Sequence, residues 1–358
     1  MSALYNLVEP ASFERLFTRF PPHAADGSPF ACATDAHGLT FFSTRFDLLT
    51  TLEPEPRRRI SALPLFTRWS NLFKLTTRFC GTTITEYAPM PRGLAADGLI
   101  ENLLEKHPPG HSLLIIKDLP DRSPLLCSQD NVFAGEVAEA ARNRGFIEVR
   151  GQALAYVPID FSSEDEYLSR LSSGRRKDLR RKLKKRDSIA LEALPLGDSR
   201  LGEKAFLDEA YAMYMEVFRQ SEIHFDRLSP DFFRVLFQGK DVGGTVFLYR
   251  RHGALVAYNI CLEHEGRLID KYIGFKYPLA RELNLYFISW FVNLNHAREQ
   301  GLSTYIAGWT DPAVKASLGA RFTFTRHPVW VRNPLLRRFL HPLRGLFEAD
   351  ARLLEGAS

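Results

Sequence analysis

The chain has 358 residues, enough for two domains that each bury a core. Its hydrophobic content of 45% and charged content of 25% are typical of a globular protein, and its 27 Phe argue against disorder. The formal net charge is +5. No segment is long and apolar enough to span a membrane, and the first residues lack a signal-peptide pattern. We therefore expect a cytoplasmic protein that binds no metal, with four cysteines that are buried reduced thiols.

The first half of the chain alternates predicted strands and helices. Residues 30–44 are predicted to form a strand pair, and residues 73–85 a second one. Residues 95–107 and 131–144 are predicted helices. The almost wholly apolar residues 113–117 are predicted to form a strand that is covered on both faces. This alternation indicates an α/β domain.

The strongest compositional feature is the basic segment at residues 174–187, GRRKDLRRKLKKRD. It holds nine Lys or Arg against two Asp, a charge of +7, so the rest of the chain sums to about −2. Its only apolar residues are Leu179 and Leu183, which predicts a helix that docks by one narrow face. The other face is either merely solvated or a binding site for a phosphate-bearing precursor or for transfer RNA. The candidates for substrate binding in this segment are Arg175, Arg176 and Arg180.

The second half has the most regular order of predicted elements. Two helices and three strands come first, at residues 203–220, 230–238, 245–250, 254–263 and 267–275. A long helix, a short strand, a short helix and a last strand follow, at residues 282–299, 303–307, 311–318 and 322–331. The long helix is apolar on nearly every face and should be buried on more than one side. Strand, crossover helix and strand form the βαβ unit of a parallel pair.

This order resembles the second half of a GNAT-type N-acyltransferase domain, in particular the branch shared by BioF2-like acetyltransferases and FemAB peptidoglycan aminoacyl transferases. The residues that carry the resemblance are Tyr272 and Gly274, Ala297 and Gly301, and the segment GWTDPAVKASLG, in which Lys315 precedes Gly319 and Phe322. The resemblance implies tandem GNAT-like lobes of α/β class, each a mixed central sheet flanked by helices. The implied parts are an N-terminal lobe at 1–161, a C-terminal acyltransferase lobe at 162–333 and an amphipathic helix at 334–358. That helix either docks on the body or makes weak contact with an anionic membrane surface.

The resemblance also suggests residues for the chemistry. Acyl transfer needs a deprotonated amine, a polarised carbonyl and a protonated leaving group. The catalytic candidates are Asp270 as a base, Tyr272 as an acid, and Lys315, which matches the family lysine. The further candidates for substrate binding are His224, Tyr305, Trp309 and Asp311. Each also has a plain structural interpretation, such as a paired carboxylate, a packed ring, a solvated histidine or a surface lysine.

The acyl donor is left open by the sequence. In relatives that use coenzyme A, a glycine-rich loop offers its amides to the pyrophosphate at a helix N-terminus. The corresponding loop here, residues 276–282, has no glycine, although Lys276 and Arg281 can supply charge as cofactor-binding residues. The first hypothesis is an N-acyltransferase that uses acyl-CoA to modify an amine on a small molecule or on an envelope or polysaccharide precursor. The alternatives are a FemAB-type transferase, which moves an aminoacyl group from transfer RNA to a peptidoglycan precursor, and a non-catalytic binding protein. DNA is not an expected partner.

Overall fold

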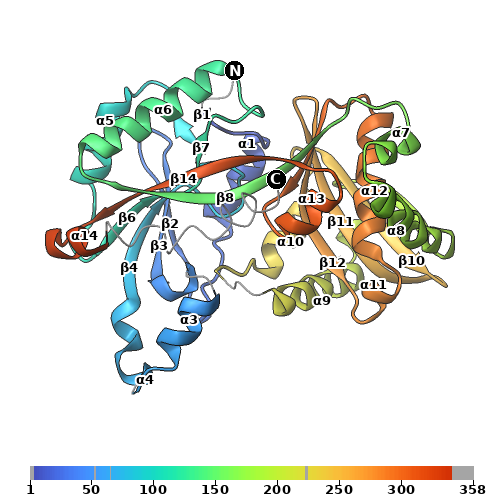
Figure 1. Ribbon diagram of the computed structural model, residues 1–358, viewed down its shortest axis with the longest axis horizontal. Coiled ribbons are helices and arrows are strands. Elements are labelled where there is room, and N and C mark those ends of the chain that lie inside the picture. Colours follow the sequence, from blue (N-terminus) through green and yellow to red (C-terminus); the bar gives the residue numbers. More distant parts are fainter. Residues whose placement is uncertain (1–3, 52–53, 65, 222–224, 341–358) are drawn as a thin grey trace. The chain divides into compact units, whose positions relative to one another are not determined.

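The computed structural model describes the chain except residues 1–3, 52–53, 65, 222–224 and 341–358 (Figure 1). The chain divides into two compact units. Unit 1 comprises Met1–Val8, Glu14–Ala153 and Thr323–Ser358, and unit 2 comprises Glu9–Phe13 and Leu154–Phe322. Two long strands, β8 (Ile147–Pro158) and β14 (Arg321–Val331), therefore have residues in both units.

Unit 1 is built on a mixed sheet. Its other strands are β2 (Ala31–Thr34), β3 (Thr40–Asp47), β4 (Lys74–Cys80), β6 (Leu113–Ile116) and β7 (Leu119–Asp121). A separate antiparallel pair is formed by β1 (Leu4–Tyr5) and β5 (Met90–Pro91). Strands β2, β3 and β4 are antiparallel neighbours, β4 pairs with β6 in parallel, and β14 runs antiparallel to β6 and β7. The helices are α2 (Leu16–Arg19), α3 (Pro54–Ser61), α4 (Phe66–Trp69), α5 (Ala96–Glu105), α6 (Ser128–Asn143) and α14 (Pro334–Leu340). Helix α1 (Ala11–Glu14) has residues in both units.

Unit 2 repeats this plan. Its other strands are β9 (Ala190–Pro195), β10 (Gly244–Arg251), β11 (Ala254–His264), β12 (Arg267–Phe275) and β13 (Thr304–Gly308). Strands β9 to β12 form an antiparallel series, β12 pairs with β13 in parallel, and β13 pairs with the end of β8. The helices are α7 (Glu164–Ser169), α8 (Ser173–Leu183), α9 (Lys204–Gln220), α10 (Pro230–Gln238), α11 (Leu279–Glu282), α12 (Leu285–Glu299) and α13 (Pro312–Ser317).

The two units thus share one order of strands, which confirms the predicted tandem lobes with mixed sheets flanked by helices. In each unit an antiparallel series leads to a parallel pair, and the second strand of that pair borders a long antiparallel strand. That border strand is β14 in unit 1 and β8 in unit 2. The chain therefore changes unit within β8 and within β14, whereas the predicted lobes end at residues 161 and 333. Domain boundaries usually fall in exposed linkers, whereas both of these boundaries fall inside strands and leave no linker to find in the sequence.

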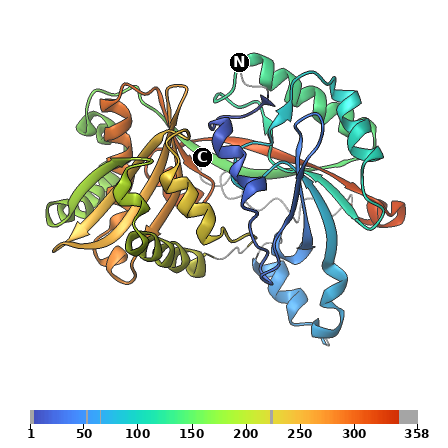
Figure 2. The ribbon, with the colours of Figure 1, turned by 180° about the vertical axis from the view of Figure 1, so that it is seen from behind.

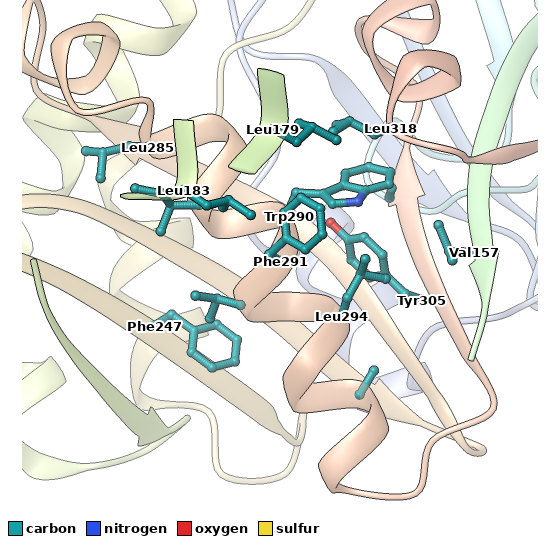
Figure 3. Close-up of a cluster of buried hydrophobic side chains, with 14 of the residues drawn as sticks. Val157, Leu179, Leu183, Phe247, Leu285, Trp290, Phe291, Leu294, Tyr305 and Leu318 are labelled. Carbon is teal, nitrogen blue, oxygen red and sulfur yellow. The ribbon is translucent and has the colours of Figure 1, made fainter. Parts of the chain in front are cut away.

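Helices cover both faces of the sheet in unit 2. Figure 3 shows Trp290 and Phe291 of α12 packed beneath Leu179 and Leu183 of α8. Helix α12 lies on the sheet, and the predicted burial of the long helix on several sides is correct because α8 covers its outer face. On the other face, the ring of Tyr258 in β11 contacts a phenylalanine of α10; Figure 2 shows α9 and α10 (olive to yellow) on this side.

Some local predictions are wrong. Residues 73–85 form the single strand β4 followed by a buried segment without regular structure, not a strand pair. The long helix is divided into α11 and α12 at Asn284, which has a left-handed φ of 56°. Of the cysteines, which are all free, Cys80 and Cys261 are buried but Cys127 is exposed. The predicted C-terminal helix begins as α14, and its residues 341–358 lie outside the described part of the chain.

The close packing of β12 on β11 yields a stability prediction. A Cβ atom on Gly274 would lie 2.2 Å from ring carbon Cε1 of Tyr258, which is fully buried. We expect Gly274→Ala to destabilise the protein by about 1–3 kcal/mol through overpacking, measured as a lower urea midpoint with an unchanged slope. The control is Gly174→Ala, where the added atom meets nothing within 4 Å. Equal stability of the two variants would contradict the prediction.

Candidate functional site

The parallel pair of unit 2 separates after three residue pairs. Strands β12 and β13 pair from Arg267 opposite Thr304 to Ile269 opposite Ile306. Beyond that point β13 continues only against β8, with Gly308 opposite Ala155. The next residue of β12 is Asp270, which therefore stands where the two strands part. We call this place the fork.

Asp270 is held at the fork by three hydrogen-bond donors. Its Oδ1 accepts from Nδ2 of Asn259 at 2.7 Å, and its Oδ2 accepts from the Tyr305 hydroxyl at 2.8 Å and from Nδ2 of Asn293 at 3.2 Å. Asn259 and Asn293 are fully buried and Tyr305 is 1% exposed, whereas Asp270 is partly exposed. Buried polar groups require such partners, so the network fixes one orientation of the carboxylate.

The phenol of Tyr305 is a permanent donor in this network. Burial raises its pKa well above the usual value of 10, and the nearby charge of Asp270 raises it further. A second phenol, Tyr286 of α12, is also protonated, because burial and the charges of Asp311 and Asp270 raise its pKa. Its hydroxyl is buried without a hydrogen-bond partner among the described residues. Tyr286 and Asn293 are seven residues apart on α12, which places both side chains on the face toward the sheet.

Tyr272, the predicted acid, lies on the other face of the sheet from Asp270. Its ring packs against Phe13, Phe232 and Phe233 at centroid distances of 6.4, 5.8 and 5.4 Å. The network of Asp270, in contrast, lies on the α12 side. The fork thus joins Asp270 to Tyr305 and does not join it to Tyr272.

Lys315 is buried rather than exposed on a helix surface. Its Nζ donates to the carbonyl oxygens of Ala307 at 2.6 Å and Gly308 at 3.1 Å. These carbonyls belong to the end of β13, beyond its last pair with β12, and a buried carbonyl needs a donor. A Cβ atom on Gly308 would lie 3.9 Å from this Nζ and 3.8 Å from the backbone oxygen of Asp270. Lys315 therefore secures the β13 side of the fork.

The predicted cofactor loop at residues 276–282 is bonded to α9. Nζ of Lys276 forms an ion pair of 2.9 Å with Glu209, and the Arg281 guanidinium donates to Gln220. The backbone amide of Tyr277 donates to the carboxylate of Glu216 at 2.7 Å. Both cations and one amide of this loop are thus engaged by side chains of α9, two of which are carboxylates.

The basic segment forms α8 and the short 3-10 helix Lys184–Ser188 that follows it. Lys182 lies 3.7 Å from the ring centroid of Phe287 at the start of α12, and Lys185 donates to the carbonyl of Glu282. The segment therefore lies beside the loop at residues 276–282. The side chains exposed along it are Arg175, Lys177, Arg180, Arg181, Lys184 and Lys185.

The predicted binding residues in this segment have different surroundings. Arg176 donates to the carbonyl of Leu171 at 2.6 Å and supports the connection between α7 and α8. Arg180 forms an exposed ion pair of 3.0 Å with Asp165, which contributes little to stability. Arg175 is exposed and remains available to a ligand in solution.

The other predicted site residues surround the fork less closely. Trp309 follows β13 and is partly exposed, and Asp311 is exposed at the start of α13 with a φ of 54°. His224 lies outside the described residues. Within the described ranges, no three His, Cys, Asp or Glu side chains form a group that could hold a metal ion.

Sequence reasoning missed Asn259 and Asn293. Each is a single amide in an otherwise apolar run, ALVAYNICL in β11 and WFVNL in α12. Burying an amide is costly unless it is hydrogen-bonded. An isolated Asn in a buried strand or helix is therefore a signal of a polar network, and this signal was available from the sequence.

The chain belongs to the FemAB-like family, which is described by the words peptidoglycan biosynthesis/recognition. The family model matches residues 117–338, more than half of the chain. This result confirms the resemblance to the GNAT and FemAB-like branch. No match was found among curated proteins.

Several solved structures share the fold. The C-terminal domain (DUF2156) of a putative lysylphosphatidylglycerol synthetase from Agrobacterium fabrum is 12% identical, with a TM-score of 0.55 over 92% of this chain and 90% of that chain. The structure of L-PGS from Bacillus licheniformis is 10% identical, with a TM-score of 0.54 over 95% and 96%. FemX is 13% identical, with a TM-score of 0.51 over 94% of each chain. None of the described helices of the present chain is long and apolar enough to cross a membrane.

The contacts of Lys315 predict a cost for its removal. Lys315→Met should leave the carbonyls of Ala307 and Gly308 buried without their donor, which costs about 1–3 kcal/mol of unfolding free energy. Urea denaturation measures this loss. The control is Lys204→Met on the exposed face of α9, where we expect a change within about 0.5 kcal/mol. A Lys315→Met variant as stable as its control would show that these hydrogen bonds do not support the fork.

Proposed function

We propose that this protein transfers an aminoacyl group from transfer RNA to an amine of a cell-envelope precursor. Family membership and the fold support an acyl or aminoacyl transferase that acts on envelope precursors. The observation that carries the choice of acyl donor is the distribution of charge around the loop at residues 276–282.

A pyrophosphate bound at this loop would meet carboxylates. Glu209 and Glu216 of α9 already bind Lys276 and the backbone amide of Tyr277. The negative charges of these carboxylates would repel those of the pyrophosphate. On α8 and the turn after it, Arg175, Lys177 and Lys184 are exposed and form no ion pair with the described residues. A donor whose phosphates extend over a long distance fits that surface better than the single pyrophosphate of coenzyme A.

In the proposed reaction, the acceptor amine attacks the ester carbonyl of the aminoacyl group. Asp270 takes the proton that the amine loses, an amide bond forms, and the ester bond to the ribose breaks. The ribose oxygen takes that proton from Asp270 as it leaves and becomes a hydroxyl of the transfer RNA, which restores the carboxylate of Asp270. Tyr305 and Asn293 hold the carboxylate of Asp270 in place, since both donate to Oδ2.

The role of Asp270 gives an activity prediction. Asp270→Asn keeps the size of the side chain but cannot accept the proton, so we expect the transfer rate to fall by about 10²–10⁴-fold. The assay follows a labelled amino acid from aminoacyl-tRNA into an envelope precursor fraction. Asp208→Asn, an exposed change on α9, is the control. A rate in the Asp270→Asn variant above one third of the wild-type rate would remove Asp270 from the mechanism.

The role of α8 gives a binding prediction. The triple variant carries Arg175→Glu, Lys177→Glu and Lys184→Glu, and it should bind aminoacyl-tRNA more weakly. The slope of the logarithm of the binding constant against the logarithm of the salt concentration should fall in magnitude by about 2–3, because each lost phosphate contact removes about 0.7–0.9. The control pair Lys204→Glu and Arg234→Glu changes exposed cations on α9 and α10. Equal losses in both variants would indicate non-specific attraction and contradict the proposed surface.

An acyl-CoA donor remains the second candidate, because one edge of β12 is open. Among the described residues, β12 has no ladder partner on the β13 side after Ile269. In the family that the sequence resembles, strand backbone holds the pantetheine of coenzyme A. Stabilisation of the protein by acyl-CoA but not by aminoacyl-tRNA in a thermal-shift titration would favour this candidate.

A further inference from the structure

Strand β12 contains one residue more than its partner at the fork. On β11, Ile260 lies opposite Tyr272 and the next residue, Cys261, lies opposite Asp270, so Lys271 is the extra residue of a β-bulge. A bulge interrupts the alternation of side chains and re-aims them. Here Asp270 points to α12, whereas Lys271 lies with Tyr272 on the other face, 5.3 Å from the ring centroid of Phe13.

Lys271 is paired with Glu9 in the interior of unit 2. The distance from Nζ of Lys271 to Oε1 of Glu9 is 2.9 Å, and the two side chains are 5% and 0% exposed. Glu9 belongs to the short segment Glu9–Phe13, which joins unit 2 although its neighbours in the chain belong to unit 1. Phe13 anchors that segment against Phe232, at a centroid distance of 6.2 Å.

Stability alone does not account for a buried ion pair. Removing two charges from water is costly, and apolar side chains of similar size often stabilise a protein equally well. An ion pair can, however, select one arrangement over another. If the bulge were lost and the part of β12 before it shifted by one residue, Lys271 would lie opposite Cys261 and face Tyr305, and Asp270 would face Glu9, since a shift of one residue exchanges the faces of a strand. The repulsion between two carboxylates then opposes the shifted arrangement.

We propose that Glu9 and Lys271 are positioning residues that fix the bulge of β12 and thereby keep Asp270 in the network at the fork. The inference deepens the proposed function, on which the catalytic part of it rests. The attraction between Glu9 and Lys271 favours the observed register, and the repulsion between Glu9 and Asp270 excludes the shifted one. Neither positioning residue contacts the substrate.

The test compares four variants of the full chain. Glu9→Gln and Lys271→Met each remove one charge, and the neutral double variant E9Q/K271M removes both. The exchanged variant E9K/K271E keeps an ion pair but exchanges the positions of its positive and negative charges. For each variant we measure thermal unfolding, the kcat and KM of transfer, and the side-chain amide NMR signals of Asn259 and Asn293. Lys204→Met, which breaks an exposed ion pair of α9, is the control.

We expect the neutral double variant to recover the thermal stability that the single variants lose, but to keep a kcat at least 10-fold below wild type with KM within threefold. The exchanged variant should regain thermal stability but not kcat, because a lysine at position 9 would attract Asp270 and favour the shifted register. The amide signals should shift in the neutral double variant, because Asn259 and Asn293 both donate to Asp270. The control should change none of these quantities.

Two results would overturn the proposal: a neutral double variant with wild-type kcat, or unchanged amide signals in that variant. The second readout does not depend on transfer activity. If the wild-type protein transfers no acyl group, the proposed function fails, and the amide signals still decide whether the ion pair positions Asp270.

Discussion

The short parallel pairing of β12 with β13 is the constraint on which the candidate site depends. A parallel pair that continued past Ile269 would fill the edge of β12 with ladder hydrogen bonds and leave Asp270 within the sheet. Because β13 continues against β8 without β12, its last carbonyls and the carboxylate of Asp270 have other partners. Lys315 donates to the carbonyls of β13. The carboxylate of Asp270 on β12 accepts from Asn259, Asn293 and Tyr305. The network of Asp270 and the contacts of Lys315 lie at the fork for this reason.

The same separation does not occur in unit 1. There β4 and β6 stay paired through Cys80 opposite Ile116, the last residue of each strand, and the amide of Lys117 still donates to the carbonyl of Cys80. A fork therefore distinguishes unit 2 from unit 1 although the order of strands is common to both. Two lobes with one topology thus differ at the position that bears on chemistry, and function has to be argued from the site rather than from the fold.

The sequence predicts what local patterns encode. Periodicity predicts the strand β12 and the apolar helix α12. The end of that helix follows from Gly301, which has a φ of 67°. The position of Lys315 follows from the resemblance, but its burial does not. The bulge at Lys271 and the partners of Asp270 depend on contacts between separate segments. Asn259 and Asp270 are 11 positions apart in the sequence, and Glu9 and Lys271 are 262 positions apart. No pattern within one segment reports such contacts.

The loop at residues 276–282 differs from a glycine-rich pyrophosphate loop in what surrounds it. The glycines of such a loop allow close backbone approach to an anion; the present loop has no glycine and is bonded to the carboxylates of Glu209 and Glu216. The negative charge of these carboxylates would repel the phosphates of an acyl donor. Cations that bind those phosphates therefore have to lie on another surface. The basic segment after α7 lies directly beside the loop, through Lys182 on Phe287 and Lys185 on Glu282. Its length of about three helical turns suits a backbone of successive phosphates rather than one phosphate pair. The charge of +7 in this segment and the carboxylates of α9 at the loop are thus the two features on which the proposed choice of acyl donor rests.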